Sequence, residues 1–243
     1  MDFRPIIENI PLLAKGLAVT LTASFFGGAL ALAIGLLLGI LSQFHKPLLD
    51  SIVRSYVYFF RGTPLLVLLF LSFFGLPVIG ISLPALVAGI IAIGFNSGGY
   101  LTEAVRAALE SIDVSQKEAA AIDGMGTWMM LTRIIFPQAS RQMVAPVTNE
   151  IVSLIKGTSL LAVISVGDVT RAAQLIVGQA FVPFEAYITL AVIYLVVASI
   201  VTRGSIIFER RLDRVLWSSD SAPRAGTGKR NLVEPETAGR SSA

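Results

Sequence analysis

Polar and ionisable residues interrupt the apolar stretch at residues 146–167. Asn149, Ser153 and Lys156 recur at offsets of four and seven residues, so a helix would carry them on one face, with Glu150 about 100° round. An anion, a cation and hydroxyl or amide groups could together meet both charges of a small zwitterion. The candidates are Asn149, Glu150, Lys156, Thr158 and Ser159. The alternative is structural: Glu150 caps or pairs near an interface, and Lys156 snorkels or bonds between helices.

Three other charged groups stand at membrane-helix ends. Glu103 and Arg106 are three residues apart, which favours an intrahelical ion pair. Asp168 and Arg171 have the same spacing just beyond the polar stretch, where a soluble partner protein would dock. The alternative interpretation is a solvated pair. The sequence Arg61-Gly62-Thr63-Pro64 is typical of a helix end anchored by a cation and kinked by proline.

Residues 115–138 have a helix-turn-helix pattern between two apolar runs. Ser115 precedes Glu118 by three residues, which predicts a capping box at the start of a helix. Gly124 and Gly126 favour a turn, and the apolar stripe that begins at Trp128 predicts a second short helix ending at Pro137. Such a segment could seat in a cleft on a soluble partner, or lie alone as an interfacial amphipathic stretch.

The spacing of this segment resembles the EAA loop of membrane subunits of ATP-binding-cassette importers. Glu118-Ala119-Ala120, Gly124 and the proline of Ile134-Ile135-Phe136-Pro137 follow that pattern, although Phe136 replaces a usual Leu. The resemblance narrows to polar amino acid permeases, and it covers roughly residues 10–215. Gly157 departs from the family, in which an acidic residue often follows the lysine. The motifs that narrow it are Phe60-Arg61-Gly62-Thr63-Pro64, Tyr100 with Glu103 and Arg106, Lys156 with Thr158-Ser159-Leu160, and Arg171-Ala172-Ala173-Gln174.

The resemblance implies roles for individual residues. It assigns ATPase docking to Glu118, Ala119, Ala120, Gly124, Arg133 and Pro137. It assigns gating or coupling near the pore to Arg61, Thr63, Pro64, Glu103 and Arg106.

The resemblance also implies partners. They are two ATPase subunits that bind ATP and Mg²⁺, a second permease copy or a homologous permease, and an extracytoplasmic binding protein that delivers a polar amino acid. The implied mechanism is alternating access. No cofactor is expected in this chain.

Composition alone indicates an all-α integral membrane protein. Hydrophobic residues make up 54% and charged residues 14% of 243 residues, and the mean hydropathy is +0.76. A spanning helix needs about 20 apolar residues. Five such helices are predicted, with the EAA loop between the third and the fourth: residues 16–41, 56–75, 84–105, 146–167 and 184–203.

The distribution of Lys and Arg predicts the orientation. Fifteen of the nineteen lie in the loops around residues 46–61 and 106–141 or from residue 203 onward, whereas Arg4, Lys15 and Arg171 lie on the other side. We therefore expect a multi-pass protein of the bacterial cytoplasmic membrane with residues 1–15 outside. Residues 16–215 would form the permease domain, and residues 216–243 a disordered cytoplasmic tail.

Several classes of function are excluded by composition. The chain has no Cys and one His, so thiolate, zinc and His-centred chemistry are absent. Gly226-Thr227-Gly228-Lys229-Arg230 lacks the full phosphate-binding pattern. The basic pI near 9.4 is explained by membrane topology and by attraction to anionic lipid headgroups, rather than by binding of nucleic acid. Two alternatives remain: an ion-gradient-driven transporter or channel, for which no internal repeat is seen, and a membrane-embedded enzyme.

Overall fold

The computed structural model describes the backbone of residues 1–217 and the side chains of residues 1–211, all of it helix, turn or loop. The α-helices are α1 (Arg4–Glu8), α2 (Ile10–Leu41), α3 (Pro47–Gly62), α4 (Leu65–Phe70), α5 (Ala85–Glu110), α6 (Val114–Ile122), α7 (Thr127–Met130), α8 (Phe136–Gly157), α9 (Val169–Ala180) and α10 (Pro183–Trp217). Short 3₁₀ turns cover Ser42–Phe44, Leu76–Ile79 and Thr158–Ile164, and wider π-turns cover Leu71–Gly75 and Leu131–Ile135.

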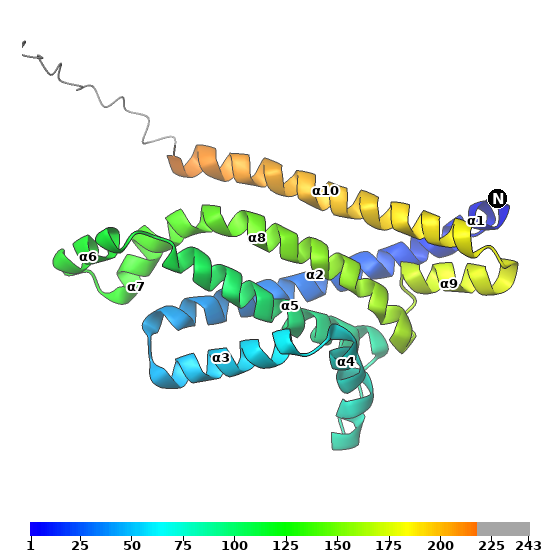
Figure 1. Cartoon of the computed structure of the whole chain (residues 1–243), viewed down its shortest axis with the longest axis horizontal. Coiled ribbons are helices and arrows are strands. Elements are labelled where there is room, and N and C mark those ends of the chain that lie inside the picture. The colour runs from blue at the N-terminus through cyan, green and yellow to red at the C-terminus, as the bar shows by residue number, and fades with distance from the viewer. Residues whose placement is uncertain (218–243) are drawn as a thin grey trace, which may run out of the picture.

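The long helices α2, α3, α5, α8 and α10 run roughly along the long axis of the molecule (Figure 1). The short helices α6 and α7 lie at one end, whereas α1 and α9 lie at the other. Helix α4 leaves the bundle sideways, because the chain bends by 101° between α3 and the segment Leu65–Ile79. The N-terminus and the end of α10 lie toward opposite ends of the molecule.

Helices α2 and α5 form the centre of the bundle, and glycines let them approach closely. A Cβ at Gly35 would lie 2.5 Å from Cβ of Leu101, and one at Gly39 would lie 2.6 Å from Cγ1 of Val105. Gly35 and Gly39 therefore serve packing within the chain.

Apolar residues cover much of the outer surface as well as the core. Only 6% of the most apolar window of α10 is buried, and Leu195 is 67% exposed. Such a surface is expected where the solvent is lipid.

Among the described residues, four helices are long and apolar enough to span a membrane, and the bent pair α3 with Leu65–Ile79 raises the number to five. The predicted all-α membrane fold is confirmed. The prediction of one continuous second span over 56–75 is wrong, because Thr63 and Pro64 are extended and break it. The third span runs over Ala85–Glu110, and the first begins at Ile10.

The fourth and fifth spans are longer than predicted. The fourth runs over Thr127–Ile164 rather than 146–167, and α10 extends to Trp217, past the predicted boundary at residue 215. Most of the predicted tail, from residue 218, lies outside the described residues. Helix α9, which connects the last two spans, was not predicted.

Candidate functional site

The break between α3 and α4 opens a groove in the middle of the molecule. Pro64 has no N–H and disfavours helical backbone at the residue before it, so α3 ends at Gly62. Proline also leaves the carbonyl oxygen of Phe60 without its helical donor, and Nδ2 of Asn96 donates to that oxygen at 2.7 Å. This bond fixes the end of α3 against α5.

The central groove has a volume of about 480 Å³ and lies between the break, α5 and α8. Glu150 and Ser153 from α8 face Arg61 across it. Glu150 is half-buried there, and it forms no ion pair with Arg61 within residues 1–211. The remaining lining residues are Gly62, Thr63, Pro64, Leu65, Ile93, Asn96, Tyr100, Leu154 and Gly157.

Glycines of α5 make room for the side chains of α3. The hydroxyl of Tyr56 donates to the carbonyl of Phe95 at 2.7 Å, and a Cβ at Gly98 would lie 2.8 Å from that hydroxyl. A Cβ at Gly99 would lie 3.2 Å from Cγ of Arg61. The guanidinium of Arg61 stacks over the ring of Tyr100, 4.9 Å from its centroid.

The structure places the five substrate candidates in different environments. Only Glu150 lines the central groove, together with the gate candidates Arg61, Thr63 and Pro64. Thr158 is fully buried, and its hydroxyl donates to the carbonyl of Ile155 at 2.6 Å. The others are not among the lining residues: Asn149 and Lys156 are exposed on α8, and Ser159 is half-buried.

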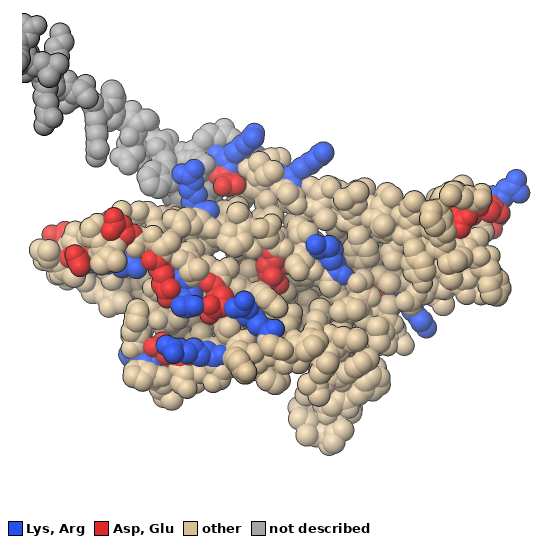
Figure 2. All heavy atoms as spheres, in the orientation of Figure 1, with Lys and Arg blue, Asp and Glu red and all other residues tan. Residues whose placement is uncertain are grey.

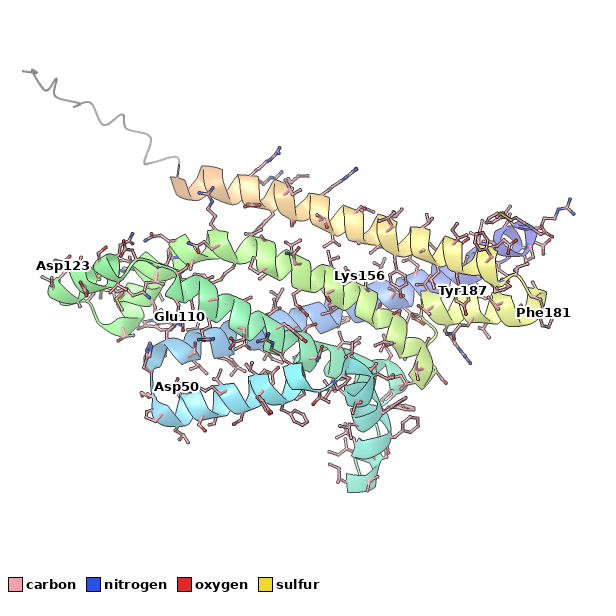
Figure 3. All side chains as sticks on the ribbon, in the orientation of Figure 1. Asp50, Glu110, Asp123, Lys156, Phe181 and Tyr187 are labelled. Atoms are coloured by element: carbon pink, nitrogen blue, oxygen red, sulfur yellow. The ribbon has the colours of Figure 1, made fainter. Side chains whose placement is uncertain are left out.

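Lys156 lies in the last turn of α8 (Figure 3). Within residues 1–211 it forms no ion pair, so the partner that Gly157 fails to provide is not supplied elsewhere in the described chain.

The two charged pairs have different outcomes. The ion pair predicted in α5 is confirmed: Nη2 of Arg106 lies 2.6 Å from Oε2 of Glu103, and Nη1 lies 3.2 Å from Oε1 of Glu110. The interpretation of Asp168 and Arg171 as a solvated pair is wrong, because Asp168 is fully buried and accepts the backbone N–H groups of Thr170 and Arg171. It caps α9. Burial raises the pKa of its carboxyl group, and these hydrogen bonds oppose that effect.

The helix-turn-helix pattern of residues 115–138 folds as two short helices, with differences at their ends. Asp113, rather than Ser115, caps α6 and accepts the N–H of Ser115, which lowers the pKa of Asp113. Gly124 has a φ of +74°, and Met125 N–H bonds to Ala120 while Gly124 N–H bonds to Ala121, which makes a Schellman turn.

The second half of this segment differs further from the prediction. Gly126 is extended and precedes α7, so the turn has only one left-handed glycine. Pro137 does not end the helix, because the π-turn at Leu131–Ile135 leads directly into α8. The helices that follow Gly126 are one continuous span.

Helix α6 is fastened to the helices on either side of it. Ala120 is 2% exposed, so its side chain faces the protein itself. Lys117 donates to the carbonyl of Leu109 at 3.4 Å, and Gln138 donates to Gln116 at 2.7 Å. A displacement of α6 would therefore reach both α5 and α8. The exposed docking candidates are Glu118, Ala119, Gly124 and Arg133, and Pro137 is half-buried.

Charged side chains gather at the end of the molecule that carries α6. Figure 2 shows most of the visible acidic and basic residues over this end, with a smaller group near α1. Asp50, Glu110 and Asp123 lie at the α6 end, whereas Phe181 and Tyr187 lie at the opposite end (Figure 3).

Several known proteins are similar to this chain in sequence and in fold. The family described as "Binding-protein-dependent transport system inner membrane component" matches residues 31–214. The chain is 36% identical over 216 residues to the probable amino-acid ABC transporter permease protein PatM of Vibrio harveyi, covering 88% of this chain and 97% of that one. It is 33% identical over 215 residues to the glutamine transport system permease protein GlnP of Escherichia coli strain K12, covering 88% and 96%.

A solved structure agrees with the sequence relatives. The crystal structure of an amino acid ABC transporter with histidines contains a chain that is 33% identical and superposes with a TM-score of 0.80. The match covers 87% of this chain and 99% of that one.

Proposed function

Because this chain belongs to the family of binding-protein-dependent transport system inner membrane components, we propose that it is the membrane-spanning subunit of an ATP-driven importer of polar amino acids. It works with two ATPase subunits, a second permease copy or a homologous permease, and an extracytoplasmic binding protein. The energy comes from ATP and Mg²⁺ in the ATPases. The chain spans the bacterial cytoplasmic membrane, with its N-terminus outside and its C-terminus in the cytoplasm.

The central groove carries the substrate part of this proposal. Glu150 and Arg61 both line it, and they carry the two charges that the ammonium and carboxylate of an amino acid need. Both lie within the spanning part of the molecule, where an ionisable group is costly unless it faces protein or water. A groove at this depth suits a site that opens to each side in turn.

The coupling part rests on how α6 is fastened. Closure of the ATPases moves α6, and the contacts of Ala120, Lys117 and Gln116 carry that motion into α5 and α8. Because α5 and α8 both line the central groove, the motion changes its access. The pore then faces outward, and release of the amino acid into the cytoplasm follows hydrolysis of ATP.

Purification of the tagged chain from its native membrane in mild detergent tests this proposal. We expect nucleotide-binding subunits to co-purify with ATPase activity, and to be lost in Glu118→Lys and Gly124→Trp. Glu8→Lys and Gly80→Trp are matched controls, because Glu8 is exposed near the N-terminus and Gly80 has a similar positive φ in open space. A chain that purifies without an ATPase and is unchanged by all four substitutions would favour a gradient-driven transporter instead.

A further inference from the structure

Three cavities follow one another along the line where α3 packs on α5. The central groove shares Arg61, Gly62 and Tyr100 with a second cavity of about 480 Å³, which is also lined by Arg54, Val57, Tyr58 and Glu103. That cavity shares Arg54 and Glu103 with a third of about 350 Å³, lined further by Ser42, His45, Asp50, Val53, Arg106 and Glu110. We name this row of neighbouring cavities, from Glu150 to Glu110, the α3–α5 groove.

Two of its three guanidinium groups are free of bound carboxylates. Arg106 is held by Glu103 and Glu110. Arg61 stacks on Tyr100 and forms no ion pair within residues 1–211. Arg54 has no hydrogen bond or ion pair within residues 1–211. The α3 side of the groove therefore presents two available cations to whatever enters it.

The positions of these cations suit successive binding of one anion. Arg54 and Arg61 are seven residues apart on α3, which places them on the same face and about 10 Å apart along the helix. Arg61 lies about 20 Å along the helix from Pro47, within the depth of a hydrocarbon core about 30 Å thick. A guanidinium at that depth needs water or protein around it, and the groove provides the space.

We propose that the α3–α5 groove is the route by which the amino acid leaves for the cytoplasm, and that its carboxylate binds first to Arg61 and then to Arg54. This inference rests on the proposed function and names the substrate contacts of its inward half. Two weak sites in series allow passage, because a single tight site would retain the anion.

Cysteine labelling tests the route, because the chain contains no native cysteine. Tyr58 lines the groove between the two arginines, whereas Phe59, the next residue on α3, is 51% exposed but does not line it. Tyr58→Cys and Phe59→Cys are compared in inverted membrane vesicles with an anionic and a cationic methanethiosulfonate reagent. We expect Cys at position 58 to react, roughly tenfold faster with the anionic reagent, and Cys at position 59 to stay unmodified in lipid.

A second pair of variants tests the role of the cations. Adding Arg54→Gln or Arg61→Gln to Tyr58→Cys should lower the preference for the anionic reagent and leave the cysteine reactive. The proposal is overturned if Cys at position 58 does not react, if positions 58 and 59 react equally, or if the preference survives both substitutions. In the first case the arginines merely snorkel beside lipid. Any of these results would leave co-purification of the ATPase, and so the importer assignment, unaffected.

Discussion

A single missing N–H group determines the local shape of the central groove. Pro64 cannot donate to the carbonyl of Phe60, and Asn96 takes over as the donor. The groove therefore depends on an amide that has no charge and no motif around it. Arg61, Pro64 and Glu150 are recognisable from the sequence as unusual residues in membrane helices. Asn96 is not, because its role exists only once α3 and α5 are packed.

Replacing Asn96 with Ala tests this account of the break. The carbonyl of Phe60 would lose its donor, which should cost about 1–3 kcal/mol in stability. Thermal unfolding in detergent measures the change. Asn149→Ala is the matched control, because Asn149 is exposed on α8 and has no hydrogen bond among those that the structure records; equal melting temperatures for both variants would contradict the account.

Asp113 gives a prediction for pH dependence. Its pKa is lowered below the usual value of about 3.9 because its carboxylate accepts the N–H of Ser115. The cap therefore stabilises α6 fully above about pH 4. This stabilisation is lost as the pH falls through the lowered pKa of Asp113. Hydrogen exchange of the α6 amides should show lower protection in acid and in Asp113→Ala. Asp113→Asn, which keeps an acceptor, should lose the pH dependence; unchanged protection in Asp113→Ala would refute the cap.

At the scale of elements, proline acts through the turn that precedes it. The N–H of Leu76 bonds to Leu71, and that of Phe136 bonds to Leu131, so a π-turn ends directly before Pro77 and again before Pro137. The wide turn makes room for the ring, which is why the helix continues through Pro137. The sequence pattern predicted that a helix ends at Pro137. A helix ends before Pro64 instead.

The close packing of α2 on α5 predicts the effect of enlarging a glycine. Gly35→Ala would press a methyl group onto Leu101 and should lower stability by about 1–3 kcal/mol. Gly204→Ala in α10 meets nothing within 4 Å and should stabilise slightly through helix propensity. Melting temperatures in detergent distinguish the two. A Gly35→Ala variant as stable as Gly204→Ala would show that α2 and α5 are less tightly packed than described.

At the scale of the whole molecule, hydropathy was enough to predict a membrane protein and the approximate positions of most of its spanning helices. The second span was the exception, because hydropathy averages over the break at Thr63 and Pro64. The sequence also could not predict which polar side chains from different helices line the same groove. Glu150 and Arg61 stood in separate groups of candidates, and only packing brings them to one groove.

The charge distribution predicts which side each end of the molecule faces. Asp123→Cys and Phe181→Cys place single thiols at opposite ends, since Asp123 and Phe181 lie at the α6 and α9 ends respectively (Figure 3). A membrane-impermeant maleimide should label position 181 in intact cells and position 123 only after the membrane is opened. Labelling of position 123 in intact cells would reverse the proposed orientation.

The most direct test of the central claim is uptake of radiolabelled polar amino acids by proteoliposomes that contain the purified complex, its binding protein and internal ATP. The account predicts ATP-dependent uptake of at least one amino acid. Glu150→Gln should lower it by roughly tenfold or more, since truncating a buried charge contact costs about 2–5 kcal/mol, whereas Asn149→Ala should have little effect. ATP-independent uptake, or full uptake by Glu150→Gln, would contradict the claim that an ATP-driven importer binds its amino acid in this groove.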